Sequence, residues 1–506
     1  MDSDVARPPD GEELAAAVQA PTVGAVATGV SWKVLSVTVG QGFWYGSLFV
    51  LAALIQPRDF GIIAVGSAVV AFTLIVLESG AGGSLIIARN LAPSSIRRAF
   101  AITSLAGLLG TAVFAGLATP IAKIFADGAD PSALRVLSII VVIAAVAIVP
   151  NALLSKHLRF QSVAKLTIAA SAVASVIAIV AGALGAGVWA LVIRLLVNQI
   201  IITALTLLAA RDLLPRRSES ADRVARPPAG RAFLMIAGAA FLAWTFDNLV
   251  VGAFTDAQQL GLYSLAFSLA FAPLTQVSWA VGQVVLPAVA AARDEEMVRR
   301  QTLKAVRMMA LVLLPLLPVA CALAPGLIPG VLGHKWEGMV VPFEILVVVG
   351  ICQGVVNILG EALAGAGVRS VRMRAQIDVT WAVATIIAIV IGVNLDGIRG
   401  AAIAHVFTFC GLAAAYAWRG RRGIDLPIAA LLGAVSGVAG CVAVQGVITA
   451  AVCLGLHALT GGWLVAGLVG AALGALAFAL VLRGRAPALY AEGRGVLTAT
   501  LSRTGR

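Results

Sequence analysis

The chain has 506 residues, of which 60% are hydrophobic and only 12% charged, and its formal net charge is +12. Soluble domains carry roughly a quarter charged residues, so this composition excludes an ordinary water-soluble globular protein. Apolar stretches of about 20 residues recur along the chain, each long enough to cross a hydrocarbon layer of about 30 Å. We therefore expect an all-α integral membrane protein.

The apolar stretches predict about fourteen transmembrane helices. They follow a polar, acidic, Pro-containing segment, residues 1–22, which we expect to be a disordered cytoplasmic tail and not a signal peptide. In chain order the predicted spans are residues 26–54, 61–88, 99–122, 134–155, 165–185, 187–209, 231–253, 260–291, 305–331, 339–366, 375–394, 398–418, 427–455 and 462–482.

The basic residues alternate from loop to loop. About 29 of them fall in every second loop and in the two terminal segments, against about five in the intervening loops, namely Arg58, Lys123, Arg135, Lys335 and Arg399. Because cytoplasmic loops carry the excess of Lys and Arg, both ends of the chain are predicted to be cytoplasmic, in a bacterial inner membrane. The positive charge thus reports orientation, and we expect no nucleic-acid partner.

The sequence contains a weak internal repeat. A shift of about 200 residues pairs Trp44 with Trp244 and Gly61 with Gly261, and a shift of about 210 pairs VIAIVAGALGAGV with IIAIVIGVNLDGI. Six predicted helices, an even number, separate the copies, so both copies have the same orientation in the membrane. A parallel repeat of this kind predicts two bundles around a central path, which suits alternating access.

The repeat also predicts the domain organisation. We expect two six-helix lobes joined by a polar, Arg-rich linker and followed by two extra helices that lie outside the repeat. The predicted boundaries are 1–22 (cytoplasmic tail), 23–210 (N-terminal lobe), 211–230 (cytoplasmic linker), 231–422 (C-terminal lobe), 423–484 (two extra transmembrane helices) and 485–506 (cytoplasmic tail).

Metal, redox and nucleotide chemistry find little support in the sequence. The five cysteines lie in apolar segments without CxxC spacing, and the four histidines lack the spacing of metal ligands, so we expect no metal site and no cofactor. No Gly-Lys dipeptide occurs, which excludes the phosphate-binding loop of a P-loop ATPase in this sequence. The predicted outer loops are short, which argues against an enzyme that works on the outer face.

Several segments resemble a known family. They include LESGAGGSLIIARNLAPSSIRRAF from Leu77, VPNALLSKHLRFQSVAKL from Val149, GAGVWALVIRLLVNQ from Gly185 and FDNLVVGAFTDAQQLGLYSLAFS from Phe246. In their order and spacing they resemble the polysaccharide-transport (Wzx-like) flippases of the multidrug/oligosaccharidyl-lipid/polysaccharide exporter superfamily. The resemblance implies a carrier that moves polyprenyl-diphosphate-linked oligosaccharide repeat units outward for cell-surface polysaccharide synthesis, with a polysaccharide polymerase and export machinery as further partners.

Charges inside predicted spans are the candidate functional residues, because each costs about 2.5 to 3.5 kcal/mol on insertion scales. Asp247 lies in the seventh span, where the resemblance places an Asp-containing motif. It is a candidate proton or cation site or gate, with a structural hydrogen bond as the alternative. Arg194, in the sixth span, suits bidentate binding of diphosphate oxygens, or else an ion pair with an acid such as Asp247.

Two weaker candidates lie nearer the predicted inner side. Glu78, in a Gly-rich part of the second span, is a coupling or gate candidate, or simply a carboxylate at the inner rim. Lys33, near the inner end of the first span, is a candidate for an entering diphosphate, although Lys at helix ends usually extends to the interface. Glu361, Asp378, Arg372 and Arg374 cluster around one predicted inner loop, and we expect them to be solvated or mutually paired, with a gate as the alternative.

Two other functions remain open at this point. One is a cation-coupled exporter of small amphipathic drugs on the same fold, whose cavity would need fewer cations. The other is a membrane scaffold that holds a glycan-assembly complex together.

Overall fold

The computed structural model describes most of the hydrophobic chain. The described residues are 40–87, 93–125, 130–156, 160–214, 245–290, 292, 294–365, 368–420, 426–485 and 487. The predicted tail 1–22, Lys33, most of the predicted linker and nearly all of the last tail lie outside them.

All regular secondary structure in the described residues is helical, as the composition predicts. An unlabelled first helix covers residues 40–54. The labelled helices are α3 (Pro57–Ile87), α4 (Pro93–Phe125), α5 (Ser132–Lys156), α6 (Phe160–Ala183), α7 (Val188–Ala209), α9 (Phe246–Phe254), α10 (Ala257–Ala290), α11 (Glu295–Leu313), α12 (Leu316–Leu327), η1 (Ile328–Leu332), η2 (His334–Met339), α13 (Val340–Gly365), α14 (Val368–Gly420), α15 (Ile428–Thr460) and α16 (Trp463–Arg485).

Twelve of the fourteen predicted spans correspond to long apolar helices in the described part of the chain, whereas large parts of the other two, 26–54 and 231–253, lie outside the described residues. In the described chain, 11 helical segments are long and apolar enough to cross a membrane, and one of them covers two predicted spans, because α14 is broken at Asp396 and Gly397. The predicted span 305–331 is interrupted between α11 and α12, at Leu314 and Pro315. A proline disturbs the backbone hydrogen bonds of a helix. The Pro315 carbonyl at this break accepts a hydrogen bond of 3.0 Å from Gln445 of α15.

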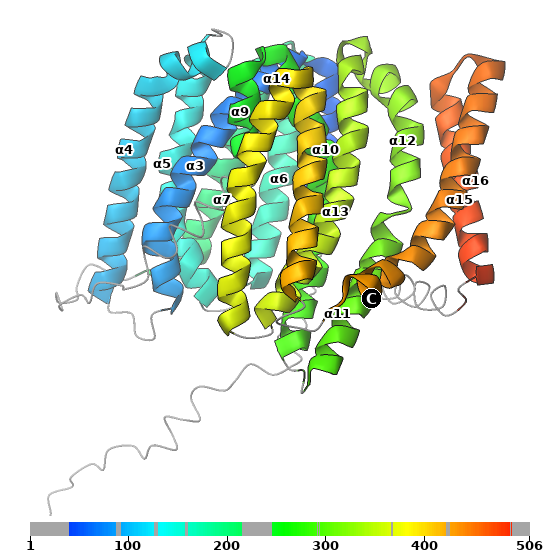
Figure 1. Cartoon of the computed structure of the whole chain (residues 1–506). Helices are drawn as coiled ribbons and strands as arrows, with labels where there is room; N and C mark the ends of the chain where they lie inside the picture. The colour runs from blue at the N-terminus through cyan, green and yellow to red at the C-terminus, as the bar shows by residue number, and fades with distance from the viewer. Residues whose placement is uncertain are drawn as a thin grey trace, which may run out of the picture.

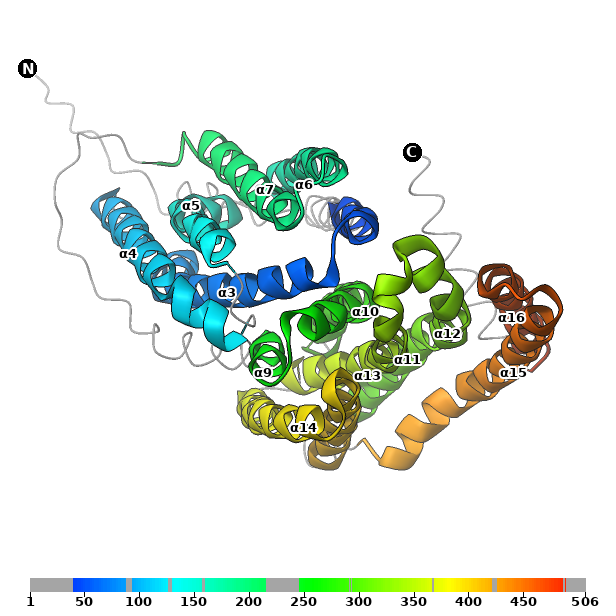
Figure 2. The same cartoon turned by 90° about the horizontal axis from the view of Figure 1, so that it is seen from above.

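The helices form two groups that meet along α3 and α10 (Figures 1 and 2). We call the helix 40–54 with α3 to α7 the first lobe, and α9 to α14 the second lobe. The last two helices, α15 and α16, pack on the outside of the second lobe against α11 and α12. We call the top of Figure 1 the outer side, after the orientation that the charges predict.

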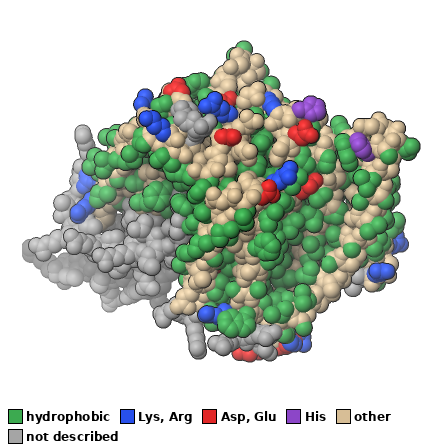
Figure 3. Space-filling view, turned by 45° about the horizontal axis from the view of Figure 1, so that its top comes forward, with side chains coloured by type: hydrophobic (Ala, Val, Ile, Leu, Met, Phe, Trp, Pro, Cys, Tyr) green, Lys and Arg blue, Asp and Glu red, His purple; other side chains and the backbone are tan. Residues whose placement is uncertain are grey.

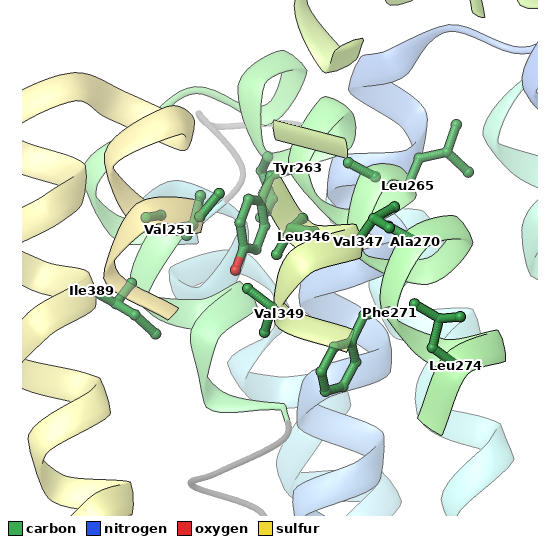
Figure 4. Packing of buried hydrophobic residues seen from close by; sticks show 14 of the residues in the cluster. Val251, Tyr263, Leu265, Ala270, Phe271, Leu274, Leu346, Val347, Val349 and Ile389 are labelled. Carbon is green, nitrogen blue, oxygen red and sulfur yellow. The ribbon is translucent and has the colours of Figure 1, made fainter. Parts of the chain in front are cut away.

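Apolar side chains fill both the interior and the surface. Figure 4 shows the tight packing of Tyr263, Leu346, Val349 and their neighbours inside the second lobe. Large apolar side chains also lie on the surface, such as Leu105 and Phe407, 69% and 73% exposed. In Figure 3 hydrophobic side chains dominate the middle of the described surface, while most charged side chains gather toward its ends. An apolar belt between charged ends is what a lipid-facing surface requires.

The sequence repeat has a counterpart in backbone geometry. Gly187, before α7, has φ 54° and ψ −128°, and Gly397, at the break in α14, has φ 53° and ψ −136°. Only glycine adopts this conformation readily, because it lacks a Cβ atom. The two residues are paired by the repeat shift of about 210, so both segments make the same turn on the outer side. The boundaries of the domains stay predictions.

Candidate functional site

The two lobes touch through a pair of glycines on the outer side. A Cβ atom on Gly61 of α3 would lie 1.9 Å from the Ala257 carbonyl oxygen, and one on Gly261 of α10 would lie 1.7 Å from that of Pro57. Both contacts are related by the shift of 200 that pairs Gly61 with Gly261 in the sequence, so they are two-fold equivalents. The helices therefore cross backbone against backbone, at a point where no larger residue fits. We call this contact between Gly61 and Gly261 the glycine crossing.

A second set of contacts joins the lobes at the same level. The Trp336 indole of η2 donates a 2.7 Å hydrogen bond to the Ala52 carbonyl, and Lys335 donates one of 3.0 Å to the Ala53 carbonyl. The Trp336 ring also meets Phe60 edge-on at 5.2 Å. We call Lys335 and Trp336 the outer latch. Together with the glycine crossing, the latch joins the two lobes on the outer side.

A cavity of about 310 Å³ lies between the lobes, below these contacts. Its walls combine aromatic rings, small hydroxyl side chains, one amide and one guanidinium, contributed by the helix 40–54, α3, α7, α9 with the preceding Thr245, and α10. The lining residues are Trp44, Leu48, Phe60, Ile63, Ala64, Ser67, Ala68, Ala71, Leu191, Arg194, Leu195, Thr245, Asn248, Ser264, Leu265, Phe267 and Ser268.

Arg194 supplies the positive charge of this cavity. Its side chain, in α7, is only 3% exposed, and its guanidinium lies 3.6 Å from the centroid of the Trp44 ring. It donates hydrogen bonds to the Trp44 carbonyl and, at 3.1 Å, to the Ser47 hydroxyl, which also receives one from Ser175. These acceptors carry no charge, so the cation is held in place without being neutralised. An anion that enters the cavity would meet a preorganised guanidinium.

Asp247 is buried at a different place, inside the second lobe. Its carboxylate accepts hydrogen bonds from the Tyr263 hydroxyl at 3.2 Å and from the Asn248 backbone at 2.8 Å, and its Oδ2 lies 3.7 Å from His405 Nε2. Of the two alternatives for Arg194, the structure therefore does not support the ion pair with Asp247. Asp247 reaches the cavity only indirectly, through its neighbour Asn248, which lines it.

Glu78 lies on the cavity side of α3, further toward the inner side. The α3 residues that line the cavity include Phe60, Ser67 and Ala71, at helical spacing. Glu78 follows Ala71 by seven residues, about two turns, so it extends the same face of the helix. It is exposed, although its helix is otherwise mostly apolar. The role of Glu78 stays a prediction.

Three of the predicted charges near the inner side form a network. Arg374 of α14 lies 3.2 Å from Glu361 of α13 and 3.6 Å from Asp378, and the Tyr416 hydroxyl donates to Asp378. Of the expected alternatives, the structure shows mutual pairing for these three residues. The network joins α13 to both halves of α14, and its residues do not line the cavity.

Two candidate functional residues were not predicted from the sequence. His405 was considered only as one of four histidines without the spacing of metal ligands, whereas the structure places it beside Asp247. Asn248 was not considered, although it lines the cavity and bonds to Asp247. An ionisable residue inside a span is itself a functional signal, and this signal was available for His405.

A family model described as "Polysaccharide biosynthesis protein" matches residues 50–341. The succinoglycan biosynthesis transport protein ExoT of Rhizobium meliloti (strain 1021) is 27% identical over 323 residues, which cover 62% of this chain and 65% of ExoT. The match therefore spans slightly less than two thirds of that relative. The lipopolysaccharide biosynthesis protein WzxC of Escherichia coli (strain K12) is 22% identical over 376 residues, 74% of this chain and 76% of WzxC.

Two solved structures share the fold. Lipid II flippase MurJ in an inward closed conformation has a TM-score of 0.69 at 12% identity, covering 90% of this chain and 98% of MurJ. An inward-facing multidrug resistance MATE family transporter of the MOP superfamily has a TM-score of 0.59 at 15% identity, covering 78% and 98% of the two chains. At these identities the likeness concerns the fold alone.

Proposed function

The chain belongs to the polysaccharide biosynthesis protein family, and from this premise we propose that it is a flippase for lipid-linked oligosaccharide. It moves polyprenyl-diphosphate-linked repeat units from the inner to the outer leaflet of a bacterial cytoplasmic membrane, for the synthesis of a cell-surface polysaccharide. The relatives named for succinoglycan transport and lipopolysaccharide synthesis support a role in the transport of polysaccharide precursors. A polymerase and export machinery then take over the product outside.

The single observation that carries the proposal is the buried guanidinium of Arg194 in a cavity between two lobes. The cavity of about 310 Å³ can hold a diphosphate with an adjoining sugar. Arg194 binds the diphosphate oxygens with charge-assisted hydrogen bonds, while hydroxyl groups and Asn248 bond to the sugar. The prenyl chain stays in lipid, beside the gap between helices.

Alternating access follows from the contacts between the lobes. The glycine crossing and the outer latch join the lobes on the outer side, which supports a cycle in which this state loads from the inner leaflet. Opening outward requires the latch to break and the lobes to pivot about the crossing of α3 and α10. Glu78, toward the inner side, and Lys33, which the sequence predicts near the inner end of the first span, would meet the substrate first.

The membrane potential assists the outward step. A diphosphate carries about two negative charges, and an inside-negative potential favours their outward movement by about 2.3 kcal/mol per charge for each 100 mV. Coupling to an ion gradient is a further part of the proposal, with Asp247 and Glu78 as the candidate sites. Neither an adenine nucleotide nor a metal cofactor is needed for such a cycle.

The cavity charge separates this proposal from its rivals. A cationic amphipathic drug would be repelled by the buried guanidinium of Arg194, whereas a diphosphate is attracted to it. A scaffold that does not transport needs no buried cation at all, and burying one is costly. Both rivals therefore leave Arg194 unexplained.

The deciding experiment depletes the protein in its host and measures which leaflet holds the lipid-linked oligosaccharide, with lipid extraction and a membrane-impermeant label. We expect the oligosaccharide to accumulate on the inner leaflet, and expression of the intact protein to reverse this. Expression of Arg194→Ala should fail to reverse it, whereas Arg135→Ala, a change in an exposed residue at the outer end of α5, should succeed. An unchanged distribution with normal surface polysaccharide would overturn the proposal.

A further inference from the structure

The second lobe contains a buried acid and a buried imidazole that face each other. Asp247 of α9 is 4% exposed and His405 of α14 is 2% exposed. Oδ2 of the first lies 3.7 Å from Nε2 of the second, close enough for a strong electrostatic interaction but too long for a hydrogen bond. The two helices pack against each other along this stretch.

The two groups differ in how well they are satisfied. The Asp247 carboxylate accepts three hydrogen bonds, from the Tyr263 hydroxyl and from the backbone and side chain of Asn248. Both ring nitrogens of His405 lack a hydrogen-bond partner, and its ring neighbours those of Phe267 and Phe409, with centroids 6.0 and 6.2 Å away. Buried polar atoms without partners are unusual and call for an explanation.

We propose that Asp247 and His405 form a proton-binding site. In the proton-free form a carboxylate with one negative charge faces a neutral imidazole. One proton taken from water onto His405 Nε2 converts this to a carboxylate and an imidazolium with no net charge. The proton-bound form suits a buried site better, because the two charges compensate each other and the imidazolium gains an acceptor.

Among the described residues, Tyr263 of α10 is a third titratable side chain in contact with this pair. Its hydroxyl group donates a hydrogen bond to the carboxylate in both forms. Because the carboxylate already accepts three hydrogen bonds and both ring nitrogens of His405 lack a partner, we place the bound proton on the imidazole. Histidine is also the side chain that gains and loses protons in the physiological pH range.

The site is connected to the cavity by two residues. Asn248 bonds to the Asp247 carboxylate and lines the cavity, and Phe267 contacts the His405 ring and lines it too. A shorter distance between Asp247 and His405 draws α14 toward α9 and shifts both cavity residues. If the proposed transport of a diphosphate holds, proton binding and substrate binding therefore influence each other, and the influence is reciprocal.

The first test counts protons on binding. The full-length protein in lipid nanodiscs is titrated calorimetrically with a polyprenyl diphosphate, in buffers of different ionisation enthalpy. We expect wild-type protein to exchange up to about one proton per bound ligand, and His405→Gln and Asp247→Asn to lose most of that exchange. His457→Gln, in a ring stack with Trp463 of α16, is the matched control and should keep it. Proton exchange that persists unchanged in His405→Gln would overturn the proposal.

The second test needs no ligand. Spin labels are attached at Leu184→Cys and Leu395→Cys, exposed positions of the two lobes on the outer side (83% and 81%), after the five native cysteines have been replaced. We expect the distance between the labels to differ between about pH 8 and pH 5 in the otherwise unmodified protein, and to be constant in His405→Gln. A distance that is independent of pH in both proteins would also overturn the proposal.

A milder substitution keeps the test valid if the variants above misfold. Tyr263→Phe keeps the ring but removes one hydrogen bond from the carboxylate. Because this makes the lone carboxylate less stable, the pH response of the labels should move to higher pH, and movement to lower pH would contradict the site. If wild-type protein does not bind the polyprenyl diphosphate, the proposed function fails, while the spin-label comparison still decides on the proton site.

Discussion

The two lobes place different chemistry at equivalent positions. In the first lobe Ser47, on the first described helix, receives a hydrogen bond from Arg194 of α7. In the second lobe the shift of about 200 leads from Ser47 to Asp247, and the shift of about 210 leads from Arg194 to the residue before His405. Both pairs therefore join the first helix of a lobe to its last.

The difference lies in which partner carries charge. Arginine is always protonated in proteins, so the first lobe presents a permanent cation held by neutral oxygens. The second lobe presents an acid and a histidine, whose combined charge depends on pH. One repeated geometry thus serves, in our proposal, an anion site in the first lobe and a proton site in the second.

The largest effect is expected from removing the cation. Arg194→Ala should lower the rate of flipping about 100-fold, because charge-assisted hydrogen bonds to the diphosphate contribute about 1.5 to 3 kcal/mol each. Arg194→Lys should recover part of the rate, since it restores the charge but not the planar fork. The measurement is the appearance of oligosaccharide on the outer leaflet of proteoliposomes. Equal rates for Arg194→Ala and the Arg135→Ala control would contradict the role of this residue.

The difference in charge between the two lobes can also be removed by placing an acidic side chain in the first lobe. Ser47→Asp places a carboxylate where the Ser47 hydroxyl now lies 3.1 Å from the Arg194 guanidinium. The new ion pair should neutralise the cation and weaken binding of a polyprenyl diphosphate about tenfold. Ser47→Ala removes the hydroxyl without adding charge and should bind more tightly than Ser47→Asp. Calorimetric titration compares the two, and tighter binding by Ser47→Asp would be inconsistent with an anion site.

The glycine crossing tests whether the lobes are equivalent where they touch. Gly61→Ala and Gly261→Ala should each destabilise the protein by about 1 to 3 kcal/mol, because the added methyl group overlaps a carbonyl oxygen of the other helix. Gly116→Ala, in α4, meets nothing within 4 Å and is the control. Thermal unfolding in detergent measures the effect. Strongly unequal effects of the two substitutions at the crossing would argue against a two-fold contact.

The smallest effect is expected at the outer latch. Trp336→Phe keeps an aromatic ring beside Phe60 but loses the hydrogen bond to the Ala52 carbonyl, worth about 0.5 to 1.5 kcal/mol. Outward opening should become about three- to tenfold more frequent. Labelling of Ser67→Cys, in the cavity, by an impermeant thiol reagent added outside would report this. An unchanged labelling rate would mean that the latch does not control access.

The sequence by itself determined that the protein lies in a membrane and that it is built of transmembrane helices. Long apolar stretches predict helices that cross a membrane, because the backbone must satisfy its own hydrogen bonds there. The repeat predicted the equivalence of Gly61 and Gly261, which the structure bears out as a symmetric contact. The charges of Arg194 and Asp247 stood out in the sequence because a charge in an apolar surrounding is costly and therefore rare.

Only the tertiary structure decided which partners these charges have. Arg194 was equally compatible with a diphosphate site and an ion pair to Asp247, because sequence spacing does not fix how a helix is rotated toward helices far away in the chain. The packed lobes rotate Arg194 toward Trp44 and Ser47, and Asp247 toward His405. Contacts across 147 and 158 residues depend on side-chain packing between helices, and local patterns in the sequence carry no record of that packing.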